Sequence, residues 1–372
     1  MVGPRVDGTV TAAASTAGDT FTTANPEPIA VSSDSEFAFE LRVCQWAERE
    51  WSPTREDAAV VVARQLGTQY RRWDTLVLEC DPAGLAARGA FGPDAFDSDQ
   101  LHVLEDAPAE WTFYRDALPD PGYPWRYVRE SIHELADRDA IDTRKRGQRI
   151  EIRRKRAYPD WVRRVVAIEN KPDLTASAAR DLADQLERDV ALGLADEVWV
   201  ATEATDERVE PILLADFPPE AGVLTVDTAT GAGETVWQPR SLATDGPGTR
   251  ITERPDDDYS AARFEYVDSE WKAEKRRAIA ERAYDRGWRS YADTMRPDCR
   301  HFELRADESG VLPYCTAKER TPTARECRGG CGAFAPEPPA WRTKGWPIAG
   351  GPGAAIKRLL ARRRRERRPG LE

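Results

Sequence analysis

The chain has 372 residues, long enough for about two or three domains with a sizeable core. It carries 65 acidic and 54 basic residues, a formal charge of −11, and only eight of the basic residues are Lys. No apolar run is long enough to cross a bilayer, which excludes a helical membrane protein.

This acidic, Lys-poor composition resembles that of proteins from salt-loving archaea. Salt weakens the counterion release that drives binding to phosphates, so the negative charge does not exclude a nucleic-acid partner. Residues 1–35 are rich in Thr, Ala, Ser and Gly and lack the apolar stretch of a secretory signal, so we expect a disordered tail. A cytoplasmic location without a membrane partner follows, and there six Cys are more typical of thiols or metal ligands than of disulfides.

The segment after the tail predicts two helices and a strand. Residues 36–51 have the spacing of an amphipathic helix, with one apolar face made by Phe37, Leu41, Cys44 and Ala47. Residues 55–66 are interpreted as a second helix that begins after Ser52 and Thr54 and ends at Gly67. The run "QYRRWDTLVLEC", residues 69–80, predicts a strand that enters a core.

Residues 82–160 differ in character and predict an inserted domain. Short helical segments precede "PWRYVRESIHELADRDAI", in which an apolar stripe is made by Trp125, Val128, Ile132 and Leu135. The basic run "TRKRGQRIEIRRKR" follows, and its Arg-Gly-Gln centre is typical of a hairpin tip. Helices followed by a basic hairpin resemble a winged helix-turn-helix. The alternative is an ordinary helical insertion with a solvated hairpin.

The core pattern resumes in residues 161–245. "VVAIENK" predicts a strand, residues 175–195 a helix, "EVWVAT" a buried strand, and residues 222–239 two strands joined by a turn. Three further segments are expected: a linker with a long basic amphipathic helix (246–296), a Cys-bearing module (297–340) and a basic tail (341–372).

Charged residues at the ends of two apolar strands carry the predicted chemistry. Glu169 and Lys171 are two positions apart, so their side chains point the same way from the strand. Asp74 lies in another apolar strand, where an unpaired carboxylate is costly. Carboxylates are the ligands that Mg²⁺ prefers, and an amine can orient an attacking water. The other explanation of the Glu169 and Lys171 pair is a surface ion pair of little energetic value.

The order of these elements resembles the PD-(D/E)xK nuclease superfamily. The resemblance implies an α/β, restriction-endonuclease-like fold, a mixed central sheet flanked by helices, formed by residues 36–81 and 161–245. It also implies that Asp74 and Glu169 hold Mg²⁺ or Mn²⁺ and that Lys171 orients the water. The remaining expected site residues are Glu40 on the first helix and Gln185 on the helix after the Glu169 strand. Glu36, one turn before Glu40, is an alternative for the Glu40 position. Asp74 and Glu169 are 95 positions apart, so the insertion must lie between two adjacent strands.

Four cysteines fall in one Pro- and Gly-rich segment with little apolar content: Cys299, Cys315, Cys327 and Cys331. Such a segment cannot fold on a hydrophobic core of its own, so a bound metal is a plausible cross-link. Four thiolates suit tetrahedral Zn²⁺ or an iron–sulfur cluster. Some nucleases of the superfamily carry a [4Fe–4S] cluster but usually place one Cys before the core, whereas here all four follow it, which favours structural zinc. His301 is an alternative ligand, and Cys44 and Cys80 are expected in the core.

These features predict an Mg²⁺-dependent nuclease that acts on nucleic acid, above all DNA. The inserted domain and the Cys module would then hold the substrate. The alternative is a non-catalytic nucleic-acid-binding protein on a nuclease-like scaffold. The first hypothesis requires the side-chain tips of Asp74, Glu169 and Lys171 to converge, and tetrahedral ligation requires the four Cys sulfurs to lie within about 4 Å of one another.

Overall fold

A computed structural model describes residues 36–205, 209, 215–253, 262–293, 295–307, 310–328 and 330–336. The predicted tails, residues 1–35 and 341–372, lie outside this described part. Within it, none of the helices has the length and apolar character needed to cross a membrane.

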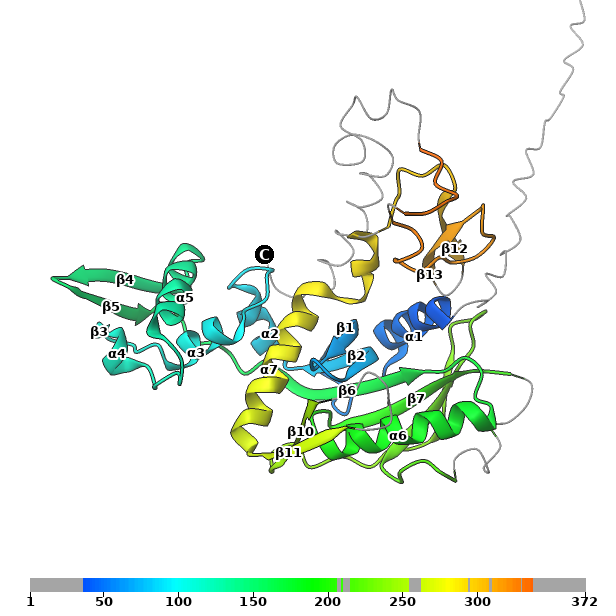
Figure 1. The fold of residues 1–372 in the computed structure, drawn as a ribbon, viewed down its shortest axis with the longest axis horizontal. Helices are drawn as coiled ribbons and strands as arrows, with labels where there is room; N and C mark the ends of the chain where they lie inside the picture. The colour runs from blue at the N-terminus through cyan, green and yellow to red at the C-terminus, as the bar shows by residue number, and fades with distance from the viewer. Residues whose placement is uncertain are drawn as a thin grey trace, which may run out of the picture.

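A six-stranded mixed sheet forms the centre of the molecule (Figure 1). Its order is β1-β2-β6-β7-β8-β9, in which β6, β7 and β8 run parallel and the other neighbours antiparallel. The expected α/β class with a mixed sheet is therefore confirmed. The strands are β1 (Ala59–Gly67), β2 (Arg72–Cys80), β6 (Val162–Asn170), β7 (Glu197–Glu203), β8 (Ala221–Val226) and β9 (Gly233–Trp237).

The predicted helix over residues 55–66 is wrong, because these residues include strand β1, which pairs antiparallel with β2. The run of Val60, Val61 and Val62 favours a strand, since β-branched side chains fit a pleated surface better than a helix. Val61 packs into the core on one face of the sheet and Val62 into the core on the other. Burial on both faces hides the period-two pattern that marks a half-exposed strand.

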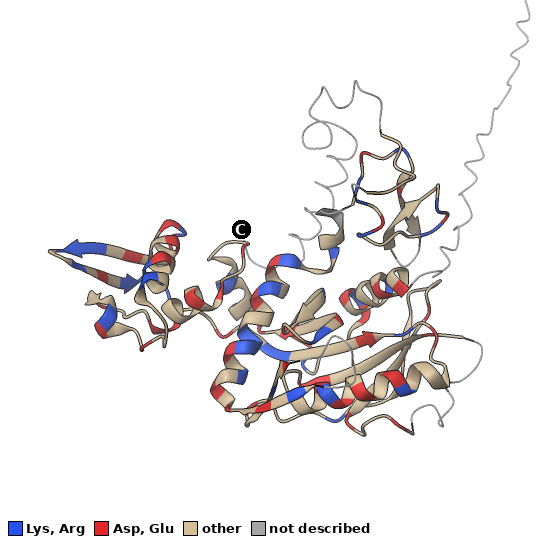
Figure 2. Ribbon diagram, viewed as in Figure 1, with Lys and Arg blue, Asp and Glu red and all other residues tan. Residues whose placement is uncertain are grey.

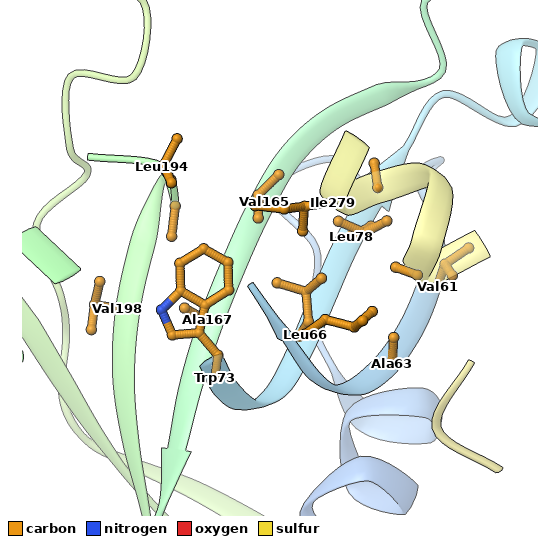
Figure 3. Close-up of a cluster of buried hydrophobic side chains, with 14 of the residues drawn as sticks. Val61, Ala63, Leu66, Trp73, Leu78, Val165, Ala167, Leu194, Val198 and Ile279 are labelled. Carbon is orange, nitrogen blue, oxygen red and sulfur yellow. The ribbon is translucent and has the colours of Figure 1, made fainter. Parts of the chain in front are cut away.

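Helices cover both faces of the sheet. Helix α1 (Glu36–Glu50) lies on one face, and α6 (Ala176–Leu192) and α7 (Ser269–Arg286) pack on the other around Trp73, Val165 and Ala167 (Figure 3). Helix α1 is more buried than an amphipathic surface helix, because Tyr291, which precedes the Cys module, and Leu312 within the module pack against it. Cys44 and Cys80 are fully buried, as expected.

Residues 246–296 contain the expected helix, but the residues before it form a hairpin. They contain the hairpin β10 (Gly248–Glu253) and β11 (Arg263–Val267), followed by α7. The buried face of α7, including Ile279 and Tyr284, belongs to the core. Helix α7 ends before Gly287, which has a φ of 58° that only glycine adopts at low cost, and a separate 3-10 helix (Trp288–Asp293) follows.

The insertion between β2 and β6 has its own hydrophobic core. Its α5 stripe is confirmed, because Val128, Ile132 and Leu135 are fully buried and Trp125 is partly buried. A three-stranded sheet of order β3-β5-β4 packs beside the helices. The elements are α2 (Pro82–Gly89), α3 (Ser98–Asp106), β3 (Thr112–Phe113), α4 (Tyr114–Ala117), α5 (Trp125–Asp137), β4 (Ile141–Arg146) and β5 (Arg149–Arg154).

A buried ion pair joins the base of this insertion to the core. Arg88 of α2 donates to both carboxylate oxygens of Glu281 on α7, at 2.6 and 2.5 Å, and both side chains are fully buried. Glu281 also accepts from the Tyr158 hydroxyl at 2.6 Å and from the backbone N–H of Phe96 at 3.0 Å. These bonds tie three segments of the insertion to one carboxylate.

Candidate functional site

Strand pairing brings Asp74 and Glu169 together. Strands β2 and β6 are antiparallel neighbours, and Thr75 pairs with Ile168. Continuing this register by one position sets Asp74 opposite Glu169, and directly opposite residues in an antiparallel pair project from the same face. The charge of Asp74 also raises the pKa of Glu169, as expected for two close carboxylates. The backbone N–H of Asn170 donates to Asp74 Oδ2 at 3.0 Å. The 95-residue separation is therefore bridged as the sequence required, by an insertion between adjacent strands.

Glu40 of α1 reaches the same end of the sheet through Gln65. Arg64 holds Glu40 with two hydrogen bonds of 2.9 Å, and Glu40 is 6% exposed. The Gln65 amide donates to Glu40 at 3.1 Å and to Asp74 at 2.9 Å. Gln65 has a φ of 53°, a left-handed conformation that costs energy for any residue other than glycine and is concentrated at functional sites.

Arg71 and Asp189 also belong to this cluster, and neither was expected. The Arg71 guanidinium donates to Glu169 Oε1 at 2.6 Å and to the two oxygens of Asp189 at 2.7 and 2.6 Å. The Trp73 indole donates to Asp189 at 2.9 Å. Asp189 lies one helical turn after Gln185 on α6, and a charged residue within the buried stripe of that helix was the available signal. Gln185 itself is partly buried and makes no hydrogen bond to the cluster in the described part of the chain.

Lys171 lies at the solvent side of the cluster. Its Nζ atom is 2.9 Å from Glu36 Oε1, and the two side chains are 32% and 63% exposed. Glu169 is only 5% exposed. The site therefore runs from a solvent-accessible amine at its mouth to a buried carboxylate inside.

Burial and mutual repulsion raise the pKa values of the acids. Removal from water raises the pKa of Glu40 and of Asp74. Burial, followed by the charge of Asp74, raises the pKa of Glu169 well above its ordinary value of 4.5. Burial alone would lower the pKa of Arg71, but Asp189 and Glu169 outweigh it and raise that pKa. The cluster is thus short of positive charge around Asp74 and Glu169.

The side-chain oxygen atoms of this cluster are of the kind that binds hard cations such as Mg²⁺. Glu169 Oε2 accepts no hydrogen bond from the described residues, and Asn170 Oδ1 is buried without a partner there. Among the described residues, no group of three or more His, Cys, Asp or Glu side chains has an arrangement that could hold a metal ion. Mg²⁺ usually takes only one or two carboxylates and completes its shell with water and phosphate, so a carboxylate pair meets its needs.

The four cysteines of the C-terminal module line one small cavity, beside the hairpin β12 (Phe302–Asp307) and β13 (Gly310–Cys315). All are free thiols, and the cavity is about 20 Å³. Burial raises the pKa of Cys327, and Cys299, Cys315 and Cys331 add to that rise. Among the described residues, no group of three or more His, Cys, Asp or Glu side chains in this module has an arrangement that could hold a metal ion, and the expected tetrahedral spacing stays a prediction. His301 lines the same cavity, but its Nδ1 atom contacts Thr316 at 3.1 Å.

Comparison with known proteins gives one family. No curated protein and no solved structure matches the chain significantly. Residues 61–336 match the profile of a family that is described as a family of unknown function, DUF5787. The matched region contains Asp74, Glu169, Lys171 and all four module cysteines, whereas Glu40 precedes it. Because the match spans most of the sequence, the chain belongs to the DUF5787 family.

Proposed function

We propose that the protein is a metal-dependent nuclease with a restriction-endonuclease-like core, hydrolysing phosphodiester bonds in DNA. The observation that carries the proposal is the placement of Asp74 and Glu169 at the same end of the adjacent antiparallel strands β2 and β6, with Lys171 on the solvent side. Two carboxylates and an amine at one sheet end are the groups that such hydrolysis requires.

Each residue has a distinct proposed role. Mg²⁺ or Mn²⁺, when bound by Asp74 and Glu169, supplies a Lewis acid for the phosphate and a bound water of lowered pKa. Arg71 fixes Glu169 through Oε1 and leaves Oε2 available, while Gln65 and the Asn170 N–H fix Asp74. Lys171 orients the attacking water, a contribution made mainly in the transition state. Glu40 orients Gln65 and thereby Asp74.

The alternative is a nucleic-acid-binding protein on the same scaffold without catalysis. Two observations favour it. The Arg71 guanidinium already pairs with Glu169 and Asp189, where a catalytic cation would compete with it. Gln185, the polar helix residue that the resemblance implies, also makes no hydrogen bond to the cluster in the described part of the chain.

The test is cleavage of DNA and RNA substrates in high KCl with Mg²⁺ or Mn²⁺. Lys171→Ala is expected to lower the cleavage rate by at least about 100-fold while binding stays unchanged, because the lost contribution is made in the transition state. Glu169→Ala is expected to lose cleavage through metal binding, so excess Mn²⁺ restores part of it. Lys275→Ala on α7 is the matched control and keeps full activity. Wild-type binding without any cleavage would support the alternative.

The insertion is proposed to be winged-helix-like. Its support is the element order: helix α3, strand β3, helices α4 and α5, then the hairpin of β4 and β5, with a sheet order of β3-β5-β4. The sequence-based alternative of a plain helical insertion does not account for the third strand, β3, beside the hairpin.

The module cysteines are proposed to hold one Zn²⁺ ion. The cavity is close to the size of a single water molecule, which suits one ion better than a [4Fe–4S] cluster. The thiols sit on turns, since the carbonyls of Cys299, Cys315 and Cys331 accept from the N–H three residues later.

A further inference from the structure

The β4–β5 hairpin concentrates positive charge on an acidic protein. Residues 141–156 contain eight Lys or Arg side chains and two acids, Asp142 and Glu151, in a chain of net charge −11. Figure 2 shows this hairpin as the most uniformly blue part of the insertion, at its end farthest from the central sheet. The net charge of the hairpin is therefore positive, whereas that of the whole chain is negative.

Internal pairing uses only some of these cations. Arg144 and Arg146 pair with Glu151, and Arg153 and Lys155 pair with Asp142. Three more, Lys145, Arg149 and Arg154, are exposed and form no ion pair within the described residues. These three side chains are therefore available to an anionic partner.

The hairpin is built to hold its shape. Arg146 pairs with Arg149 across a two-residue turn, and Gly147 at its first position has a φ of 61°, as a type II′ turn requires. The guanidinium groups of Arg144 and Arg153 lie 4.4 and 4.8 Å from the ring of Trp111. These contacts stiffen both strands, so little conformational freedom is lost when the hairpin binds.

The exposed charged side chains of helix α5, next to the hairpin, are basic in the first half of the helix and acidic in the second half. Its first half exposes Arg126, Tyr127 and Arg129, and its second half exposes acids, Glu130, Glu134 and Asp137. A polyanion would therefore meet the N-terminal half of α5, where the positive end of the helix dipole adds to the two Arg charges. The acidic half would turn away from it.

We infer that the N-terminal half of α5 and the β4–β5 hairpin bind B-form duplex DNA, with α5 in the major groove and the hairpin cations on the phosphates. The B-form major groove is wide enough for a helix, whereas that of an RNA duplex is deep and narrow. The inference deepens the proposed nuclease function by naming its substrate. The inference rests on the proposed nuclease function only for the cleavage that follows binding.

The experiment is fluorescence anisotropy with DNA duplex, single strand and RNA duplex in EDTA, where no cleavage occurs. The test variant combines Lys145→Ala, Arg149→Ala and Arg154→Ala. The control combines Arg55→Ala, Arg240→Ala and Arg263→Ala, three exposed cations outside the insertion, so both lose equal charge. The test variant is expected to lose at least about tenfold in duplex affinity, and its log–log salt slope to become shallower by about 2 to 3. The control is expected to bind almost as wild type.

Three outcomes overturn the inference: equal losses in test and control variants, unchanged binding by the test variant, or tighter binding of RNA duplex than of DNA duplex. Circular dichroism and thermal unfolding establish that each variant is folded. Because EDTA removes catalysis from the assay, a failure here is separate from a failure of the cleavage test with Lys171→Ala.

Discussion

The two charged regions of this protein differ in how their charges are satisfied. In the candidate site, Arg71, Glu169 and Asp189 are all at least nine-tenths buried and bond to one another at 2.6 to 2.7 Å. In the β4–β5 hairpin, Arg144 and Arg146 are 46% and 78% exposed although both pair with Glu151. The same residue types therefore have different energetic roles in the two places.

This difference teaches which charges the fold depends on. A buried charge that loses its partner leaves another charge without solvent, which is strongly destabilising. An exposed charge that loses its partner is hydrated by water at little cost. Mutations in the cluster should therefore change stability, and mutations in the hairpin should change binding.

The largest effect is expected in a third region, the Cys module, if its four thiols hold the proposed zinc ion. Protein purified without chelator is expected to contain one zinc per chain by elemental analysis, and Cys327→Ser is expected to lose it. Structural zinc contributes on the order of 10 kcal/mol, so the variant module should become sensitive to protease. Cys44→Ala, in the core, should keep its metal. Iron in place of zinc would favour a cluster, and neither metal would refute both.

Arg71→Ala should give the next largest effect and tests the comparison directly. It leaves Glu169 and Asp189 buried without their shared cation, so we expect a loss of about 3 to 5 kcal/mol in the free energy of unfolding. Urea unfolding followed by circular dichroism measures it. Arg146→Ala in the hairpin is the control and should change stability by less than about 0.5 kcal/mol. Equal losses would mean that burial does not separate the two regions.

The pH dependence of stability isolates Glu169. The raised pKa of Glu169 means that the folded state holds the proton more tightly than the unfolded chain does. The contribution of Glu169 to the free energy of unfolding therefore declines as the pH rises above 4.5 and through the folded-state pKa. Glu169→Gln removes that decline. Between pH 4 and pH 8, we therefore expect the free energy of unfolding of the variant to rise relative to that of wild type by on the order of 1 kcal/mol.

Asp227→Asn is the control with the opposite sign. Hydrogen bonds from the backbone of Thr230 and Ala229 lower the pKa of Asp227, so its contribution is present above its ordinary pKa of 3.8 and is lost as the pH falls. A Glu169→Gln variant whose stability parallels that of wild type across the whole range would contradict the raised pKa.

Gly147→Ala should have the smallest effect. Alanine at a φ of 61° costs about 1 kcal/mol, and this cost falls on the hairpin alone. We expect faster amide exchange in β4 and β5 and a modest loss of duplex affinity, with unfolding of the core unchanged. Gly246→Ala, at a position with no neighbour within 4 Å of the added carbon and no positive φ, should behave as wild type.

Sequence patterns identified the strands that carry Asp74 and Glu169, because their apolar runs are bounded by charged residues. The hairpin around Gly147 was equally visible, since its turn residue and basic flanks are local features. Strand β1 was misassigned as a helix because burial on both faces removes the period-two pattern. The segment before α7 was taken as a linker because β10 and β11 lack an apolar run, and Ile251 is the one buried residue within these two strands.

The sequence by itself determined the α/β class, the two strand acids, the amine beside them and the basic hairpin, since each depends on residues close together in the chain. Only the tertiary structure decided the partners: Arg71 reaches Asp189, 118 positions away, and Gln65 joins Glu40 to Asp74. The physical reason is that a buried charge is compensated by whatever group the packing brings within hydrogen-bond distance, and no local pattern encodes that distance.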